Sequence, residues 1–302
     1  MIIEEELLME WGIVADEVVK VSKDLYQKIL DAVYESKPKI SRINGLPFFE
    51  GTFEYADKDG NDIFRGVKSL KVDYLMYAIA NINEYNALVI GSEGSNSESD
   101  FESRYLKVVS ALYRDGTPIS TYMREIFHEV KHIYQRAMEM ESREDLYQKV
   151  LETVNNTTVS EIKRYVATTL YYTFVHEQDA FVSGFYGFLE QNGPMDFEDA
   201  LYYSEYRNLK DTHAYVSKYS NRREIRDVLG EFGFTPKTYN KRVHYALKRI
   251  KKKMSNAYKK YALSNRKFHD SILRASTSLQ EEYNHYYPGI ECGIESIYNY
   301  GN

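Results

Sequence analysis

Residues 128–132 read His128-Glu129-Val130-Lys131-His132, and this pentapeptide decides how we interpret the chain. On an α-helix, residues four apart project from one face about one turn from each other, so both imidazoles can reach the same metal ion. The glutamate after the first histidine would lie beside that ion without binding it, where it can take a proton from a water molecule. The spacing therefore predicts a zinc site with a neighbouring general base.

The flanking residues predict that the pentapeptide lies on a helix embedded in a domain. Ser120 or Thr121 can cap this helix directly after the turn formed by residues 115–118. Apolar side chains recur along one side of it: Met123, Ile126, Phe127, Val130 and Ile133. A helix with such a side is expected to bury it in the core.

A third metal ligand, Glu177, is predicted on a second helix downstream. Thr158 followed by Glu161 resembles a capping box, and the apolar spacing carries that helix on through Glu177. Small side chains follow at or near helical spacing: Ala180, Gly184 and Gly187. Such a stripe lets two helices approach closely, as a carboxylate must to share a metal ion with the histidine helix.

Other assignments remain open at this stage. His176 and Asp179 are alternative third ligands, projecting about 100° and 200° around the helix from Glu177. Asp179 can instead orient a ligating imidazole. The two histidines can also be solvated residues of a site without metal, since Lys131 between them indicates a wet surface.

His128-Glu129-x-x-His132 followed by Glu177-x-x-Ala180 resembles the zincin metallopeptidases, and among them the gluzincin arrangement, where a glutamate on a second helix completes the site. The resemblance covers about residues 100–190. It implies an α+β fold with a zincin-like β-sheet, an active-site helix and a second ligand helix; the sequence pattern adds a mainly helical C-terminal region. It implies His128, His132 and Glu177 as Zn²⁺ ligands and Glu129 as general base. Phe181 departs from the thermolysin-like pattern, which has Asp there, and the spacing to Glu177 is longer.

Peptide hydrolysis needs a further donor for the oxyanion besides the metal. Five side chains are chemically able to serve, and the sequence does not select among them: Tyr171, Tyr172, Tyr186, His176 and His213. In zincins the strand nearest the active-site helix pairs with an extended substrate, so the resemblance implies that a strand within residues 86–113 has this role. A zincin scaffold that no longer cleaves is the alternative, against which the intact Glu129 argues.

The rest of the N-terminal part is predicted to be a helix followed by strands. The helix covers residues 13–36, with a strand at 17–21 as the alternative. Strands are predicted at 48–55, 63–67, 70–79, 87–90 and 105–113, with a turn at 57–61 and an exposed loop at 91–100. After the break at 191–194 the pattern becomes helical. We therefore predict a zincin-like metallopeptidase domain over residues 1–192 and a helical, basic region over 193–302.

Composition limits the setting of the protein. The single cysteine, Cys292, excludes an internal disulfide and fits a reducing compartment. The N-terminus is acidic where a secretory signal is basic, and no apolar run is as long as a membrane span. We expect a soluble protein without signal peptide, transmembrane segment or membrane partner, either cytoplasmic or part of a particle assembled inside cells. The 29 tyrosines fit an AT-rich coding genome or a surface that contacts other proteins.

Positive charge is concentrated near the C-terminus. Residues 218–267 hold sixteen Lys or Arg against three acids in a chain of net charge −6. Such asymmetry is expected of a region that binds nucleic acid or another anionic partner. A solvated helix face, or a contact with the acidic half of the same protein, explains it equally. Residues 228–239 resemble a helix-turn-helix core, although Leu229 stands where that motif needs a small residue. Thr235 as N-cap before Pro236 explains the same residues as an ordinary helix start. A possible basic binding surface follows: Lys241, Arg242, Lys248, Arg249, Lys251, Lys252 and Lys253.

Two functional hypotheses follow. The first is a zinc-dependent metallopeptidase acting on a peptide or protein substrate. The second is a non-catalytic interaction or assembly protein, for example a viral one, in which a zincin-like core carries a basic C-terminal surface for a partner or nucleic acid. The oligomeric state is not predicted.

Overall fold

The computed structural model describes residues 14–40, 46–84, 98–100, 104–139, 145–156 and 158–286. The chain packs as one compact unit through Tyr258, and a second unit begins at Lys259. The division predicted between residues 192 and 193 lies inside the first unit, so packing does not mark it, and it stays a prediction.

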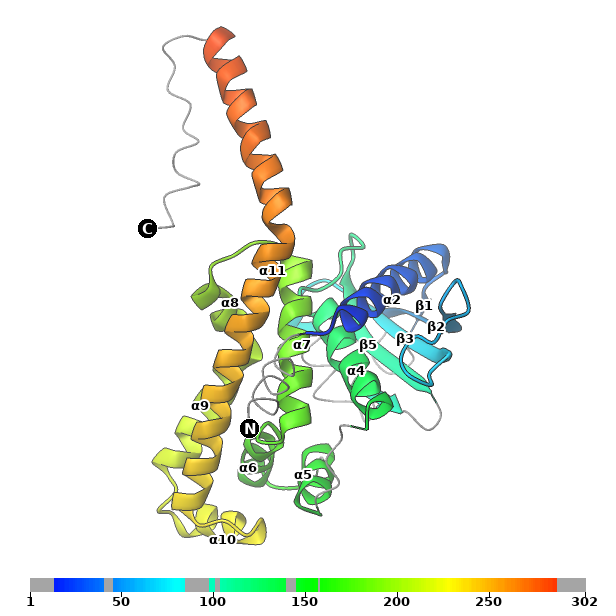
Figure 1. Ribbon diagram of the computed structural model, residues 1–302. Coiled ribbons are helices and arrows are strands. Elements are labelled where there is room, and N and C mark those ends of the chain that lie inside the picture. The colour runs from blue at the N-terminus through cyan, green and yellow to red at the C-terminus, as the bar shows by residue number, and fades with distance from the viewer. Residues whose placement is uncertain are drawn as a thin grey trace. The chain divides into compact units, whose positions relative to one another are not determined.

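The first unit is a mixed α+β structure around a five-stranded sheet (Figure 1). The strands lie in the order β1-β2-β3-β5-β4, and β3 and β5 run parallel while the other neighbours run antiparallel. Their bounds are β1 Lys39–Ile40, β2 Pro47–Ala56, β3 Ser69–Ile79, β4 Glu98–Asp100 and β5 Tyr105–Tyr113. Because β4 is the last strand in this order, its outer edge has no neighbouring strand among the described residues.

The predicted strands at 48–55, 70–79 and 105–113 are confirmed as β2, β3 and β5. Alternation explains β3, in which Leu70, Val72 and Met76 are fully buried between more exposed residues. Residues 63–67 are not a strand: Phe64 and Val67 form only an isolated bridge, and β2 pairs with β3 instead. Residues 91–100 were predicted to form a loop, and this prediction was wrong for the last three, Glu98–Asp100, which form β4. The strand predicted at 87–90 lies outside the described residues.

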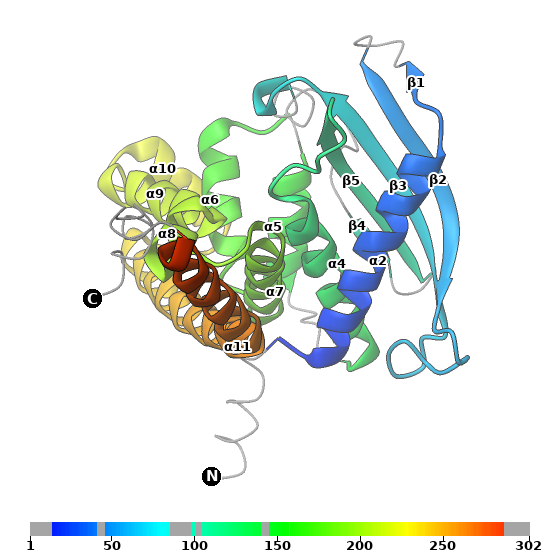
Figure 2. The same cartoon turned by 90° about the horizontal axis from the view of Figure 1, so that it is seen from above.

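Two helices lie against one face of the sheet, as Figure 2 shows: α2 (Asp16–Glu35) and α4 (Tyr122–Ala137). The predicted helix over 13–36 is confirmed where it is described, and the alternative strand at 17–21 was wrong. Helix α4 carries the pentapeptide, and all five predicted apolar side chains of its inner face are buried. Helix α7 (Val175–Asn192) packs along α4. The sheet thus supports α4, and α4 supports α7.

The second predicted helix is broken before Glu177. Ser160, not Thr158, caps α6 (Glu161–Tyr171) by accepting a hydrogen bond from the Lys163 amide at 3.3 Å. Phe174 is then the N-cap residue of α7, so Glu177 lies in the first turn of a new helix, where the helix dipole favours a negative charge. The break therefore places the carboxylate better than one continuous helix would.

The stripe of small residues brings α4 and α7 together as predicted. A Cβ atom on Gly187 would lie 2.7 Å from Phe127 Cδ2 and 2.8 Å from the Met123 carbonyl oxygen. A Cβ atom on Gly184 would lie 3.2 Å from the Arg124 carbonyl oxygen. Only glycine permits this approach at position 187.

We expect Gly187→Ala to destabilise the protein by about 1–3 kcal/mol, because overpacking outweighs the helix propensity gained. Gly230→Ala is the matched control. Its added Cβ atom meets nothing within 4 Å, so the same change should be neutral or stabilise by up to about 1 kcal/mol. Urea unfolding measures both free energies; an equal change in the two variants would contradict close α4–α7 packing.

The remaining helices are α5 (Asp145–Asn155), α8 (Phe197–Tyr203), α9 (Glu205–Lys218), α10 (Arg223–Glu231) and α11 (Pro236–Tyr286). Gly233, with φ +78°, ends α10, and Thr235 caps α11 by accepting from the Thr238 amide at 3.3 Å. The ordinary helix start thus accounts for these residues, and α11 is far longer than a recognition helix. No described helix combines the length and apolarity needed to cross a membrane.

Candidate metal centre

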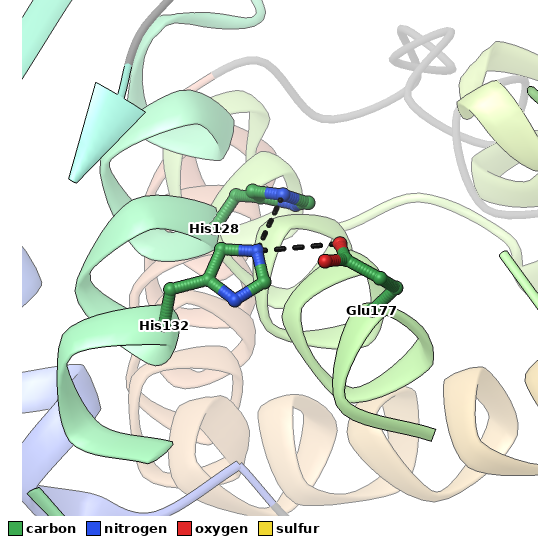
Figure 3. A group of neighbouring side chains, drawn as sticks. All are labelled: His128, His132 and Glu177. Atoms are coloured by element: carbon green, nitrogen blue, oxygen red, sulfur yellow. Dashed lines mark hydrogen bonds and ion pairs between the residues drawn. The ribbon is translucent and has the colours of Figure 1, made fainter. Parts of the chain in front are cut away.

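Three side chains from two helices meet between α4 and α7 (Figure 3): His128, His132 and Glu177. One possible ligand atom from each lies within 4.8 Å of the others. The Nε2 atoms of the two imidazoles are 3.2 Å apart, and His132 Nε2 is 3.3 Å from Glu177 Oε2. The helical spacing of the pentapeptide therefore brings both histidines together, and the α4–α7 packing adds the carboxylate.

Gln135 fixes the orientation of the His132 ring. Its Nε2 donates a hydrogen bond to the His176 carbonyl oxygen at 2.9 Å, so its Oε1 must be the atom 3.1 Å from His132 Nδ1. The imidazole consequently carries its proton on Nδ1 when neutral and directs the lone pair of Nε2 toward His128 and Glu177. A hydrogen bond of this kind orients metal-binding histidines.

Glu177 is fully buried and has two different oxygen environments. Oε1 accepts a hydrogen bond from the Tyr147 hydroxyl at 2.7 Å and lies 3.3 Å from His176 Nε2. Oε2 makes no hydrogen bond of good geometry with any described residue, although it faces His132. A buried carboxylate oxygen without such a bond is costly. A cation held between Oε2 and the two imidazoles would offset that cost, so the residues present fit a metal ion.

The pKa values of the two histidines shift in opposite directions. Burial and the neighbouring His132 lower the pKa of His128 from 6.5 to about 4. Burial also acts to lower the pKa of His132, but the Glu177 carboxylate outweighs it and raises that pKa above the ordinary value. Although burial opposes it, the three surrounding histidines hold the pKa of Glu177 well below its ordinary value. At neutral pH the group thus offers a neutral His128 and an ionised Glu177.

At mildly acidic pH, zinc binding should therefore displace a single proton, the one on His132. A protonated imidazole cannot bind metal, so affinity should fall about tenfold per pH unit once the pH drops below the raised pKa of His132. His128 stays neutral until pH approaches its own pKa, about 4. Competition titrations between pH 7.5 and 5 measure this slope; the release of two protons throughout that range would contradict it.

Tyr147 is expected to strengthen metal binding by holding Glu177. Tyr147→Phe removes the hydroxyl but keeps the ring, which packs against Phe174 and His176. Loss of a hydrogen bond to a ligand typically costs 10- to 100-fold in metal affinity, and we expect about tenfold. Tyr165→Phe is the matched control, because its hydroxyl also donates to a glutamate, Glu161, outside the centre. Equal zinc affinities in the two variants would exclude this role.

The neighbours of the histidines differ in exposure. Glu129 and His128 are partly exposed, whereas His132 is buried. The prediction that Lys131 marks a wet surface was wrong: it is only 5% exposed, and its ammonium lies 4.7 Å from the centroid of the Tyr134 ring. Burial lowers the pKa of Lys131, while Asp179 acts to raise it.

Asp179 neither joins the three side chains nor orients an imidazole; it forms an ion pair with Lys253 of α11. His176 is buried, and its Nε2 lies 3.3 Å from Glu177 Oε1, not from the oxygen that faces His132. Among the candidate oxyanion donors, Tyr171 is near Glu177, since burial and that carboxylate raise its pKa well above the ordinary value. The others pack elsewhere: Tyr172 on Phe181, Tyr186 on Phe127, and His213 on Ser217 and Tyr239.

The predicted basic surface is only partly a surface. Lys253 is held by Asp179, and Lys251 Nζ is 3.2 Å from Glu198 Oε1. Arg242 donates to Thr173 Oγ1 at 2.9 Å and stacks over Phe174, which fixes the break between α6 and α7. Lys251 is exposed despite this ion pair, and the remaining members are exposed as well: Lys241, Lys248, Arg249 and Lys252.

Gln135 and Tyr147 were missed by the sequence interpretation. Gln135 had a usable signal, because it lies three residues after His132 on the same helix. Tyr147 had none, since only the packing of α5 brings it to Glu177. Comparison with protein-family models, with curated proteins and with solved structures finds no match for this chain.

Proposed function

We propose that the chain is a zinc-dependent metallopeptidase with a gluzincin-like centre, in which His128, His132 and Glu177 hold the metal ion. The observation that carries the proposal is the convergence of two imidazole nitrogens with a buried carboxylate oxygen. Catalytic zinc sites typically have three protein ligands, for example two nitrogen atoms and one oxygen atom, and a water molecule in the fourth position. Zinc bound there would polarise a substrate carbonyl and lower the pKa of a water ligand toward about 7.

Glu129 is proposed to be the general base. It directly follows His128, it is partly exposed, and its carboxylate acts to raise the pKa of His132. From this position it can accept a proton from the attacking water and deliver it to the leaving amine. Tyr171 and His176, near Glu177, are the better placed of the candidate oxyanion donors.

Strand β4 is the proposed substrate-binding edge. It pairs antiparallel with β5 at one end of the strand order, and it contacts α4. An extended peptide can add to such an edge through main-chain hydrogen bonds. The strand expected within residues 86–113 to bind the substrate is thus proposed to be the three residues Glu98–Asp100.

Peptide hydrolysis tests the proposal. The zinc-loaded chain is incubated with a mixture of unstructured peptides, and mass spectrometry identifies the products. We expect cleavage that stops when the metal is chelated and returns when zinc is restored. Cleavage that persists after complete removal of zinc would overturn the proposal, as would its absence from a chain that carries one zinc ion.

A further inference from the structure

Four exposed lysines form a straight row on α11. At 100° per residue, Lys237, Lys241, Lys248 and Lys252 lie within about 40° of one line along the helix, and their span is about 22 Å. All four are exposed, and no described carboxylate lies within ion-pair distance of their ammonium groups. We call these four residues the lysine row.

The opposite face of α11 is apolar and packed into the first unit. Its buried members are Tyr239, Val243, Ala246, Leu247, Ile250 and Met254. Figure 2 shows α7 between α4 and the part of α11 that belongs to the first unit, so this part of α11 lies on the side of α7 away from the sheet. Packing fixes the rotation of the helix and directs the lysine row to solvent.

The charge of this helix opposes its own stability. Residues 232–269 contain no Asp or Glu, so no acid can pair with a lysine one turn away. Lysines at i and i+4, as in Lys237–Lys241 and Lys248–Lys252, repel each other, and Lys237 lies in the first turn, where the helix dipole disfavours a cation. A face that only needs solubility gains more from mixed charges. The segregation therefore points to an external anion.

We infer that the lysine row, with Tyr245, binds the phosphate backbone of single-stranded nucleic acid. Closely spaced phosphates match a row of ammonium groups, and lysine contacts to phosphate supply affinity without sequence preference. Tyr245 lies beside the row, between Lys241 and Lys248 along the helix, and is 56% exposed. Its ring meets the His244 ring edge-on, and an exposed aromatic ring at this position can stack on an unpaired base. This binding does not depend on the metal centre.

Other anionic partners fit this face less well. Insertion into a membrane surface requires an exposed apolar face, and the apolar face of this part of α11 is buried. A protein interface has an apolar or aromatic centre surrounded by polar residues, whereas lysines dominate here. These partners become outcomes of the test.

The experiment measures binding of the full chain to a fluorescent 30-nucleotide single strand by anisotropy at several salt concentrations. The test variant changes Lys241, Lys248 and Lys252 to glutamine. The matched control changes Lys37, Lys58 and Lys68, which are exposed in other parts of the unit, and it has the same net charge. Each lost phosphate contact lowers the salt slope by about 0.7. We expect a slope smaller by about 2 and affinity lower by about 10- to 100-fold in the test variant alone.

Tyr245 gives an independent measurement. Tyr245→Ala should weaken binding of the single strand by about tenfold and leave duplex binding unchanged, whereas Tyr245→Phe should restore stacking. Equal losses in the two lysine variants would overturn the inference. No binding to the single strand, or tighter binding to anionic vesicles or to an acidic protein than to the oligonucleotide, would overturn it as well.

Discussion

Glu177→Gln is expected to abolish stoichiometric zinc binding while leaving the protein folded. The amide keeps the size of the side chain and can still accept the Tyr147 hydrogen bond through one oxygen. It replaces the charged oxygen that faces His132 with a poorer ligand, and the low pKa of Glu177 means that the wild type offers a full negative charge there. We expect zinc affinity to fall at least about 100-fold, measured by competition with a chromophoric chelator.

Glu190→Gln provides the control for this variant. Glu190 is on the same helix, and its carboxylate is 2.6 Å from Lys23 Nζ, at the opposite end of α7 from Glu177. The same chemical change at this position should leave zinc affinity within about twofold of the wild type. If Glu177→Gln kept full affinity, the third ligand would have to come from another residue.

Glu129→Gln is expected to separate metal binding from catalysis. Because Glu129 is not one of the three converging side chains, the variant should retain one zinc ion per chain. The variant lacks the carboxylate proposed to accept the proton, and loss of a general base typically slows catalysis by about 10²–10⁴-fold. Measuring zinc content and peptide cleavage on the same sample tests both expectations.

Glu125→Gln is the companion variant, one helical turn before Glu129 on α4. Its carboxylate is engaged by Arg124, with an oxygen 2.6 Å from the guanidinium. This variant should cleave at nearly the wild-type rate. Equal losses of rate in both variants would contradict a specific role for Glu129 and indicate a general effect of charge near the centre.

The parts of the centre that depend on local spacing could be predicted from the sequence. Two histidines four residues apart must share one helical face, so His128 and His132 followed directly from the helix. The glycines at positions 184 and 187 predicted the close approach of α7 because packing against a backbone needs a missing side chain. Alternation likewise predicted β3, whose buried residues recur every second position.

The parts that depend on tertiary contacts could not be predicted. Helical periodicity continues through residues 172–174, yet the chain breaks there, where Arg242 from a distant segment binds Thr173 and stacks on Phe174. Asp179 looked like a possible ligand because only its sequence distance from Glu177 was known; a lysine 74 residues later pairs with it. Tyr147 reaches Glu177 from α5, which no local pattern connects to α7.

Zinc content of the tag-free wild-type chain, measured by elemental analysis after dialysis against zinc-free buffer, tests the central claim most directly. A centre of two histidines and a buried carboxylate predicts about one zinc ion per chain, and none in His132→Ala. A folded wild-type chain that holds no zinc, even after the metal is added back, would contradict the account of these three residues as a metal centre.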